Sequence, residues 1–202
     1  PFSPLDVLEE YIRPARCKID GKLEVLPALS DIVQLQYDKI GKLEAFNTDG
    51  LRSILKTMPH IHHVIEKTLR YPGHAKLIQK ELLTKKIDLK SPKTLSSIFE
   101  KWKLYPDEKE FTILDVRVKT SDKHLNYFLF DETDSESGTT SMARTTGFTA
   151  TATINLLIDG HFKEAGVYPP ELISNRDFNA WDYIKRYLSE RKISIDVISK
   201  NM

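Results

Sequence analysis

The stretch EKTLRYPGH, residues 66–74, joins an extended segment to a helix and concentrates charged and aromatic side chains at the junction. Because alternate side chains of a strand share a face, Glu66 and Arg70 are predicted to project together. The Pro-Gly dipeptide at 72–73 predicts a turn, and we expect a helix to begin near His74. The stretch therefore predicts a strand, a turn and a helix that meet at one corner.

Three chemically useful groups are expected around this corner: the Arg70 guanidinium, the Tyr71 phenol and the His74 imidazole. A guanidinium matches the two oxygens of a carboxylate, and imidazole is the usual proton carrier near neutral pH. Two structural alternatives stay open. Glu66 and Arg70 could form only a surface ion pair of small energetic value, and His74 could only cap its helix.

A second polar phrase, NTDG at residues 47–50, stands where a strand is expected to end and a helix to begin. One interpretation makes Asp49 a helix cap, because a carboxylate there binds free backbone N–H groups and favours the helix dipole. The other makes Thr48, Asp49 and the exposed N–H groups a grip for a polar substrate. The pattern alone favours neither.

A third cluster is SMARTTGFTATA at residues 141–152. Arg144, Thr145 and Thr146 are expected to precede a helix whose first turn carries little bulk. Such a helix start suits an anion or a close backbone approach, but it also occurs wherever helices pack tightly.

Composition indicates a folded chain and excludes several classes of function. The 202 residues are 40% hydrophobic and 29% charged, with 30 Lys and Arg against 29 Asp and Glu, so no basic field points to nucleic acid. No apolar run approaches the length of a membrane span. One cysteine, Cys17, excludes an intrachain disulfide and suits a cytoplasmic location. The tract HIHH at 60–63 lacks partners with metal-ligand spacing, so we expect no metal site.

The remaining patterns predict an α+β fold. A Ser3 cap and Pro4 open a first helix, Asp20-Gly21 marks a hairpin, and the polar segment 85–97 is taken as a connector. The further expected elements are an extended segment over 31–46 that is broken at Gly41, a short helix over 48–58, strands over 110–120 and 124–133, helices over 146–160 and 179–192, and a strand over 193–198. Asp177 is a candidate cap of the last helix. There is no GxGxxG or GxxxxGK[ST] loop. We therefore expect a mostly antiparallel, mixed sheet with helices on one face.

Five segments of the chain together resemble the C-terminal domain of the saccharopine dehydrogenase-like family, closest to its lysine 6-dehydrogenase branch. They occur in the family's order and span most of the chain: EEYIRPA at 9–15, LEAFNTDGLRSIL at 43–55, EKTLRYPGHAKLI at 66–78, MARTTGFTATATINLLIDG at 142–160 and GVYPPELI at 166–173. The resemblance implies that residues 1–202 form one substrate-binding and dimerisation domain, folded like the C-terminal domain of glyceraldehyde-3-phosphate dehydrogenase.

The resemblance also implies a function and a set of partners. A Rossmann domain, in cis or in trans, would hold NAD or NADP, and this domain would bind an amino-acid substrate of lysine or saccharopine type and form a homodimer. The 202 residues hold no Rossmann domain, so we expect a cut or separately encoded half of an oxidoreductase.

Carried over from the family, the site residues divide into two groups. Arg70 or Arg144 would bind the carboxylate, and Thr48, Asp49 and Thr145 would orient the amine or ribose; Asp49 and His74 are the candidate catalytic residues. The alternative is a non-catalytic dimerisation or ligand-binding domain. Neither version involves nucleic acid or a membrane.

Overall fold

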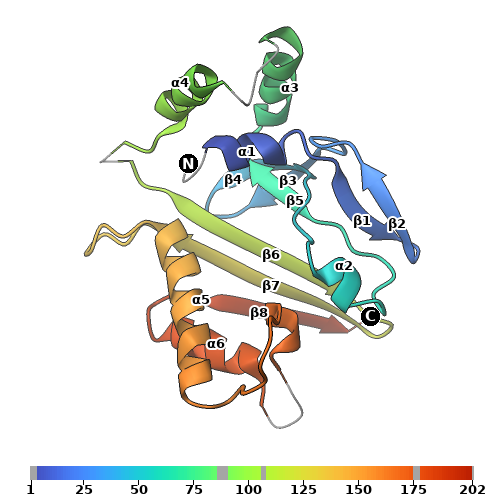
Figure 1. The fold of residues 1–202 in the computed structure, drawn as a ribbon, viewed down its shortest axis with the longest axis vertical. Coiled ribbons are helices and arrows are strands. Elements are labelled where there is room, and N and C mark those ends of the chain that lie inside the picture. The colour runs from blue at the N-terminus through green and yellow to red at the C-terminus, as the bar shows by residue number, and fades with distance from the viewer. Residues whose placement is uncertain (1–3, 86–90, 106–107, 175–177, 202) are drawn as a thin grey trace. The chain divides into compact units, whose positions relative to one another are not determined.

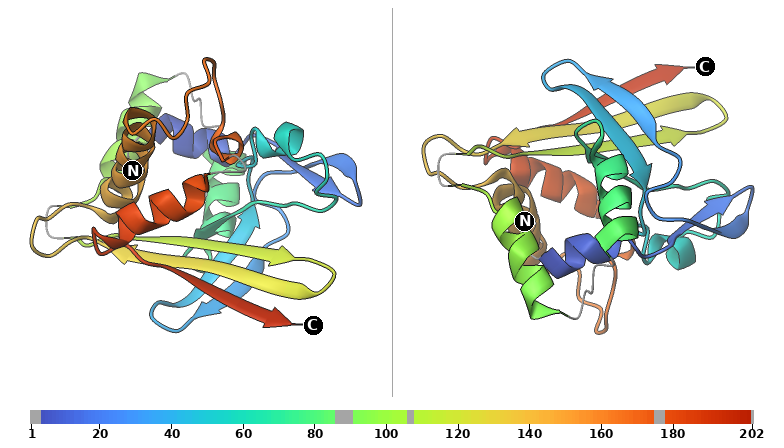
Figure 2. Two further views of the ribbon diagram at one scale, coloured as in Figure 1. Left: turned by 90° about the horizontal axis from the view of Figure 1, so that it is seen from below. Right: turned by 90° about the horizontal axis from the view of Figure 1, so that it is seen from above.

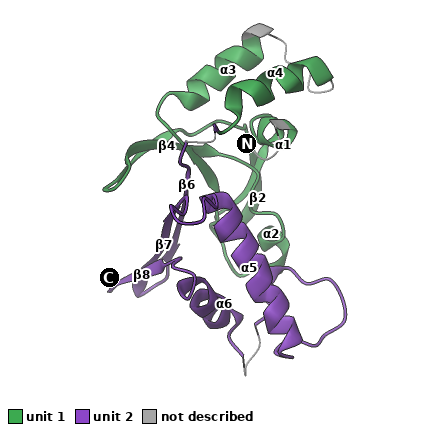
Figure 3. Cartoon of the chain, turned by 90° about the vertical axis from the view of Figure 1, so that its left-hand side faces the viewer, with its two compact units in different colours: residues 1–104 green, residues 105–202 purple. Residues whose placement is uncertain are grey.

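The computed structural model describes residues 4–85, 91–105, 108–174 and 178–201. Its elements confirm the expected α+β class, with antiparallel pairing in every sheet that is described. Within these residues the strands form three small sheets, of two, three and three strands. The chain divides into two compact units, residues 1–104 and 105–202, which Figure 3 shows in different colours.

The first unit opens with a helix and a hairpin. Helix α1 (Pro4–Glu10) begins at the predicted proline, while the expected Ser3 cap lies outside the described residues. Strands β1 (Ala15–Ile19) and β2 (Lys22–Leu26) pair around Asp20 and Gly21. Both turn residues have positive φ, 49° and 80°, which is the backbone of the tight hairpin turn that an Asp-Gly pair favours.

The central sheet of the first unit has the order β3-β4-β5. The extended segment expected over 31–46, with its break at Gly41, is a hairpin of β3 (Val33–Tyr37) and β4 (Gly41–Asn47). Gly41 turns the chain with a φ of 90°, a conformation that costs glycine little. Strand β5 (Lys67–Arg70) then pairs with the other edge of β4, so β4 is the middle strand.

Further helices of the first unit are labelled in Figure 1. These are α2 (Ile54–Thr57), α3 (His74–Lys85) and α4 (Pro92–Trp102). Helix α3 confirms the expected turn and helix after β5. The connector expected over 85–97 is wrong for its second half, where α4 begins. Ser91 caps α4 by accepting from the Thr94 N–H, with Pro92 in the first turn, and this start signal was present in the sequence.

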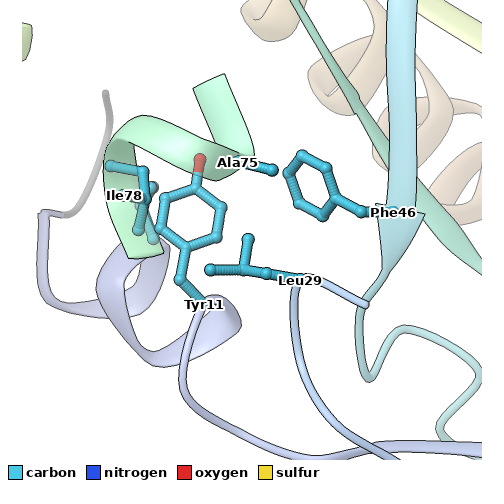
Figure 4. Packing of buried hydrophobic residues seen from close by; sticks show 6 residues of the cluster. Tyr11, Leu29, Phe46, Ala75 and Ile78 are labelled. Atoms are coloured by element: carbon cyan, nitrogen blue, oxygen red, sulfur yellow. The ribbon is translucent and has the colours of Figure 1, made fainter. Parts of the chain in front are cut away.

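The core of the first unit forms around Tyr11 and Phe46. Figure 4 shows the Tyr11 ring near Leu29 and Ile78, with its phenol oxygen directed toward α3. The buried cluster consists of Val7, Tyr11, Leu29, Phe46, Ala75 and Ile78, with Leu82 and Trp102 packed against it. One core thus joins α1, the chain after it, β4, α3 and α4.

The second unit has an antiparallel sheet of order β6-β7-β8, and the helices α5 and α6 lie in the chain between β7 and β8 (Figures 1 and 2). Its elements are β6 (Phe111–Lys119), β7 (Lys123–Glu132), α5 (Ser141–Ile158), the short 3-10 helix η1 (Pro170–Leu172), α6 (Ala180–Ser189) and β8 (Ile195–Asn201). Leu129 and Ile195 of the sheet pack against Leu188 of α6 and Phe148 of α5. The expected pair of strands and both helices are confirmed, and Gly160 with φ 74° follows the end of α5 as predicted.

The sequence also predicted a cap for the last helix. The proposed Asp177 cap lies outside the described residues, and Asn179 caps α6 instead by accepting from the Trp181 N–H. Among the described helices, none combines the length and the apolar character needed to cross a membrane.

Candidate functional site

One face of the β4–β5 pair carries most of the predicted site residues of the first unit. Antiparallel pairing sets Glu44 opposite Arg70 and Phe46 opposite Thr68, and directly opposite residues project from the same face. Glu66 and Thr48 continue this face beyond the paired residues, because Thr48 bonds both Glu66 and Thr68. The alternation predicted for residues 66–70 therefore holds.

Arg70 and His74 meet at the expected corner, joined by a phenol. The Arg70 Nε donates to Tyr11 Oη at 3.0 Å, and His74 Nε2 lies 2.9 Å from the same oxygen. The phenol at the corner is thus Tyr11 and not Tyr71, whose side chain is exposed. Tyr71 lies directly after the last residue of β5, and its ring is exposed to solvent there.

Arg70 is only partly satisfied by its protein neighbours. Its Nη1 donates to the Leu69 carbonyl at 2.8 Å, whereas its Nη2 lies 3.6 Å from the Glu10 carboxylate, a loose contact. The Arg70 side chain is 34% exposed. The guanidinium is thus held through Nε and Nη1, and its Nη2, with only the loose Glu10 contact, can bind an anion from solvent.

A buried carboxylate on β4 holds the turn that carries His74. Glu44 accepts from the Gly73 N–H at 2.8 Å and from the Ala75 N–H at 2.6 Å. Gly73 has φ 93°, which a residue with a side chain rarely adopts. Glu44 therefore satisfies the first free N–H groups of α3, and His74 does not have to cap the helix.

The other end of the face is built around Glu66. Its Oε2 accepts from Thr48 Oγ1 at 2.6 Å and from the Gly50 N–H at 3.1 Å. A Cβ added to Gly50 would lie 2.6 Å from the Glu66 carboxyl carbon, so the glycine permits this close approach. Glu66 and Arg70 therefore do not form the ion pair that was the structural alternative, because each has other partners.

Burial shifts the protonation of this face toward neutral forms. It raises the pKa of Glu66 above 4.5, against the hydrogen bonds from Thr48 and Gly50, and the charges of Glu10 and Asp49 raise it further. Burial also lowers the pKa of His74 below 6.5, and the nearby Arg70 charge acts in the same direction. The pKa of Tyr11 is raised by burial, so its phenol keeps its proton.

We call these residues the β5 cluster. Its members are Tyr11, Thr48, Glu66, Thr68, Arg70 and His74. The cluster combines one anion-binding cation with a carboxyl group whose pKa is raised and an imidazole whose pKa is lowered, and both shifts favour the neutral form. Such a set can bind a carboxylate and exchange protons with a bound ligand.

Asp49 lies beside Thr48, but its carboxylate faces another part of the unit. Arg16 donates to it from Nε at 2.9 Å, from Nη2 at 2.8 Å and from its backbone N–H at 3.2 Å. These bonds to Arg16 lower the pKa of Asp49. The predicted helix cap is wrong, because α2 starts only at Ile54 and Ser53 precedes it. In the described structure Asp49 joins the start of β1 to the end of β4.

Arg144 and Thr145 lie in the first turns of α5, which begins at Ser141 and not after them as expected. The buried Arg144 contacts Asp131 through Nε at 3.2 Å and Nη2 at 3.2 Å. Its Nη2 also donates to the Arg191 carbonyl, and Thr145 donates to the Ser141 carbonyl within the helix. Arg144 therefore stabilises the junction of α5 with β7, and its role toward a substrate stays a prediction.

The starts of α3, α5 and α6 are filled by the chain's own side chains. Besides Glu44 at α3, Glu110 accepts from the Met142 N–H of α5 at 2.7 Å, and Ser174 accepts from the Ala180 N–H of α6 at 3.1 Å. These helix starts do not fit a nucleotide pyrophosphate, which would need the same N–H groups free. In the described ranges there is also no group of three or more His, Cys, Asp or Glu that could hold a metal ion.

Antiparallel sheets, packed helices and a polar face on one strand define the class as an α+β domain with a candidate ligand site. Residues 1–190 match the saccharopine dehydrogenase C-terminal domain family, and the chain belongs to that family.

A solved structure of apo, histidine-tagged saccharopine dehydrogenase (L-Glu forming) from Saccharomyces cerevisiae has a similar fold. The TM-score is 0.71 at 16% sequence identity, and the match covers 98% of this chain and 61% of that chain. At this identity the similarity concerns the fold alone. The chain thus spans about three fifths of the length of that protein.

Sequence reasoning missed three residues that build the site. Glu44 looked like one polar residue among others in a strand, and Glu66 was considered only as an ion-pair partner. Tyr11 lies in the segment EEYIRPA, which pointed to the family but not to a role. Its contacts to Arg70 and His74 span 59 and 63 residues of sequence, so no local pattern could have found it.

Proposed function

We propose that this chain is the substrate-binding part of an NAD(P)-dependent oxidoreductase that acts on a C–N bond of an amino acid of lysine or saccharopine type. The single observation that carries the proposal is the half-open Arg70, held by Tyr11 beside His74. Family membership supports the reaction class. Within the family, we place the substrate nearest to that of the lysine 6-dehydrogenases.

Arg70 binds the substrate carboxylate in this proposal. The Glu10 carboxylate lies 3.6 Å from Nη2, which is a loose contact. A substrate carboxylate whose two oxygens both face the guanidinium makes shorter and better oriented hydrogen bonds. The amine then lies along the same face, where Thr48 and Glu66 offer oxygen atoms. His74 exchanges a proton with the reacting nitrogen, and Asp49 supports Thr48 through its bonds to Arg16.

The cofactor is held by a nucleotide-binding domain, in the same polypeptide or in another. NAD or NADP accepts the hydride, and no step of the proposal for this chain passes through it. The helix starts described above are capped by Glu44, Glu110 and Ser174, which supports a cofactor site outside them. Arg144 and Thr145 remain candidate contacts to the substrate or the ribose.

A homodimer is part of the proposal. Leu114, Val116 and Val118 are exposed on one face of β6, and alternation places them in a row. A row of exposed apolar residues favours association. Sedimentation of the wild type and of Val116→Lys tests it: we expect a dimer that the substitution weakens. A monomer at all concentrations would exclude the dimer.

The proposed enzyme is cytoplasmic and binds neither nucleic acid nor membranes.

Binding to the chain itself tests the site. We expect L-lysine, saccharopine or glutamate to perturb the backbone amide resonances of residues 66–74, and we expect Arg70→Ala to remove this response. Arg13→Ala is the matched control, because Arg13 forms only a partly exposed pair with Glu9 on α1. Cadaverine, which has amines but no carboxylate, should not bind.

Activity separates the enzyme from a non-catalytic binding or dimerisation domain. The chain is mixed with a separately expressed nucleotide-binding domain of the family, and reduction of NAD or NADP is followed with each amino acid. Amine-dependent reduction that appears only on mixing and is lost in Arg70→Ala supports the enzyme. Ligand binding without any reduction, in the mixture and in the joined polypeptide, would favour the non-catalytic domain.

A further inference from the structure

Tyr11 Oη contacts both Arg70 and His74, so its hydrogen bonds bear on which nitrogen of His74 carries the proton. The Arg70 Nε–H always donates, because a guanidinium has no acceptor, so Tyr11 Oη accepts at 3.0 Å. The phenol has one proton to donate, and the His74 Nε2 lies 2.9 Å from it. No other bond of this hydroxyl is recorded in the described part of the chain. Tyr11 is buried, so its phenol proton needs an acceptor within the protein. One arrangement provides it: Arg70 Nε–H donates to Oη, and Oη–H donates to Nε2.

We propose that Tyr11 is a positioning residue that holds His74 as the neutral tautomer with its proton on Nδ1. Nε2 then accepts from the phenol, and Nδ1–H becomes the single donor of this imidazole. Within the described residues, Nδ1 has no hydrogen-bond partner. The tautomer itself does not depend on the proposed function. The role of Nδ1–H as the donor to the ligand rests on that function.

The surroundings of His74 support a fixed ring. Tyr11 and Trp102 pack against the imidazole with ring centroids 5.4 and 6.4 Å away. The charged groups that face it are Arg70 from β5 and Glu44 from β4. Glu44 is committed to the Gly73 and Ala75 N–H groups, so it holds the start of α3 in place. Protonation of the imidazole would place a second positive charge beside Arg70, so the Arg70 charge favours the neutral form of His74.

The tautomer also has a consequence for proton transfer. A neutral imidazole with its proton on Nδ1 can donate from that nitrogen only when Nε2 takes up a proton, and Tyr11 Oη–H is already hydrogen-bonded to Nε2. When Nδ1 gives its proton to a basic atom of the ligand, Tyr11 can pass its proton to Nε2, and Arg70, whose charge opposes the effect of burial on the pKa of Tyr11, stabilises the phenolate. The ligand is the proton acceptor, and return of its proton to Nδ1 restores the phenol.

The test is nitrogen NMR of the chain labelled with 15N-histidine. A two-bond proton–nitrogen spectrum above pH 7 distinguishes protonated from unprotonated ring nitrogens, and the spectrum of His74→Gln assigns the His74 signals. We expect the wild type to show a protonated Nδ1 and an unprotonated Nε2. A wild type with the proton on Nε2, or a mixture of both tautomers, would overturn the inference without any further variant.

Tyr11→Phe then tests the role of the hydroxyl. It keeps the ring that packs against Phe46 and Trp102 and removes only the oxygen. We expect a shift from one tautomer to a mixture, and an upward shift of the pKa of His74, because the donor to the neutral ring is lost. Tyr127→Phe is the matched control, since Tyr127 also packs edge-on to a tryptophan, Trp181, and should leave His74 unchanged.

The two proposals fail separately. If the tautomer is as expected but L-lysine, saccharopine and glutamate leave both nitrogens unchanged, the positioning stands and the function fails. If these amino acids bind and His74 carries its proton on Nε2, the function stands and the inference is overturned. Should Tyr11→Phe not fold, as judged by its amide spectrum, the wild-type tautomer alone decides.

Discussion

At the scale of single residues, Glu66 is subject to opposing influences that the structure separates. Burial raises its pKa, hydrogen bonds from Thr48 and Gly50 lower it, and the charges of Glu10 and Asp49 raise it again. Because each influence comes from a different residue, single substitutions should move the pKa in opposite directions. Glu66 is thus the residue whose protonation reports most directly on the β5 cluster.

We expect Glu10→Gln to lower the pKa of Glu66 and Thr48→Val to raise it. The first change removes a like charge, and the second removes a donor to the ionised carboxylate. The measurement is a carbon NMR titration of the side-chain carboxyl groups. Glu9→Gln is the control, because Glu9 pairs with Arg13 and does not act on Glu66. Equal pKa values in Glu10→Gln and the wild type would contradict the assigned cause.

At the scale of elements, the start of α3 depends on a carboxylate from another strand. Glu44 is 3% exposed and satisfies two backbone N–H groups of the turn and helix. A buried donor that loses its acceptor costs about 1–3 kcal/mol. The helix therefore owes its position to β4 as much as to its own sequence.

Glu44→Ala should lower the free energy of unfolding by at least about 2 kcal/mol, because two donors lose their acceptor. Urea unfolding followed by circular dichroism measures the loss, and amide exchange at Ala75 should accelerate. Glu44→Gln keeps one acceptor oxygen and should lose less. Glu24→Ala, on the exposed side of β2, should change the free energy by less than about 0.5 kcal/mol. Equal stability of Glu44→Ala and Glu24→Ala would refute the capping role.

The junction of β7 and α5 rests on a buried ion pair. Arg144 and Asp131 have side chains only 10% and 6% exposed. Removing one partner of such a pair leaves an unpaired buried charge, which costs about 3–5 kcal/mol. The same guanidinium is a predicted substrate contact, so stability and ligand binding have to be measured together.

Arg144→Ala should destabilise the chain by about 3 kcal/mol or more, as measured by urea unfolding. The matched control is Glu136→Ala, because Glu136 forms an ion pair with Lys192 in which both side chains are about 80% exposed. Asp131→Asn should restore part of the loss when combined with Arg144→Ala, since no charge then remains buried. Unchanged stability in Arg144→Ala, together with lost substrate binding, would show that Arg144 serves the ligand instead.

At the scale of the whole molecule, His74 links folding to pH. Its folded-state pKa is lowered from 6.5 by burial and by Arg70, so the unfolded state binds a proton first as the pH falls. Stability from this group is fully present above pH 6.5 and is lost as the pH falls through the lowered pKa. Glu66 acts with the opposite sign, because its raised pKa lets the folded state take up a proton first.

We expect the stability difference between the wild type and His74→Gln to shrink as the pH falls from 8 to 5, because only the wild type has to charge a buried imidazole. Urea unfolding at each pH measures it. His63→Gln is the control, since His63 is exposed, and it should follow the wild type. A constant difference for His74→Gln across this range would disprove the linkage.

The local parts of the fold and of the site were predictable from sequence. The order strand, turn and helix around residues 66–74 follows from alternation and the Pro-Gly pair, and so does the hairpin at Asp20-Gly21. Strand alternation and the Pro-Gly turn were also sufficient to predict that Arg70 and His74 lie at one corner. Ser91 and Pro92 are a helix-start signal for α4. The helix was missed because a polar, charged segment is also typical of a connector.

The partners of each functional side chain were decided only by the tertiary structure. Arg16 binds Asp49 across 33 residues, Asp131 binds Arg144 across 13, and Tyr11 joins Arg70 and His74 from a different helix end. Periodicity and turn chemistry depend on residues that are close in sequence, so they act in the same way whatever the rest of the fold is. Hydrogen-bond partners and displaced pKa values arise from burial, and burial exists only after distant segments have packed together.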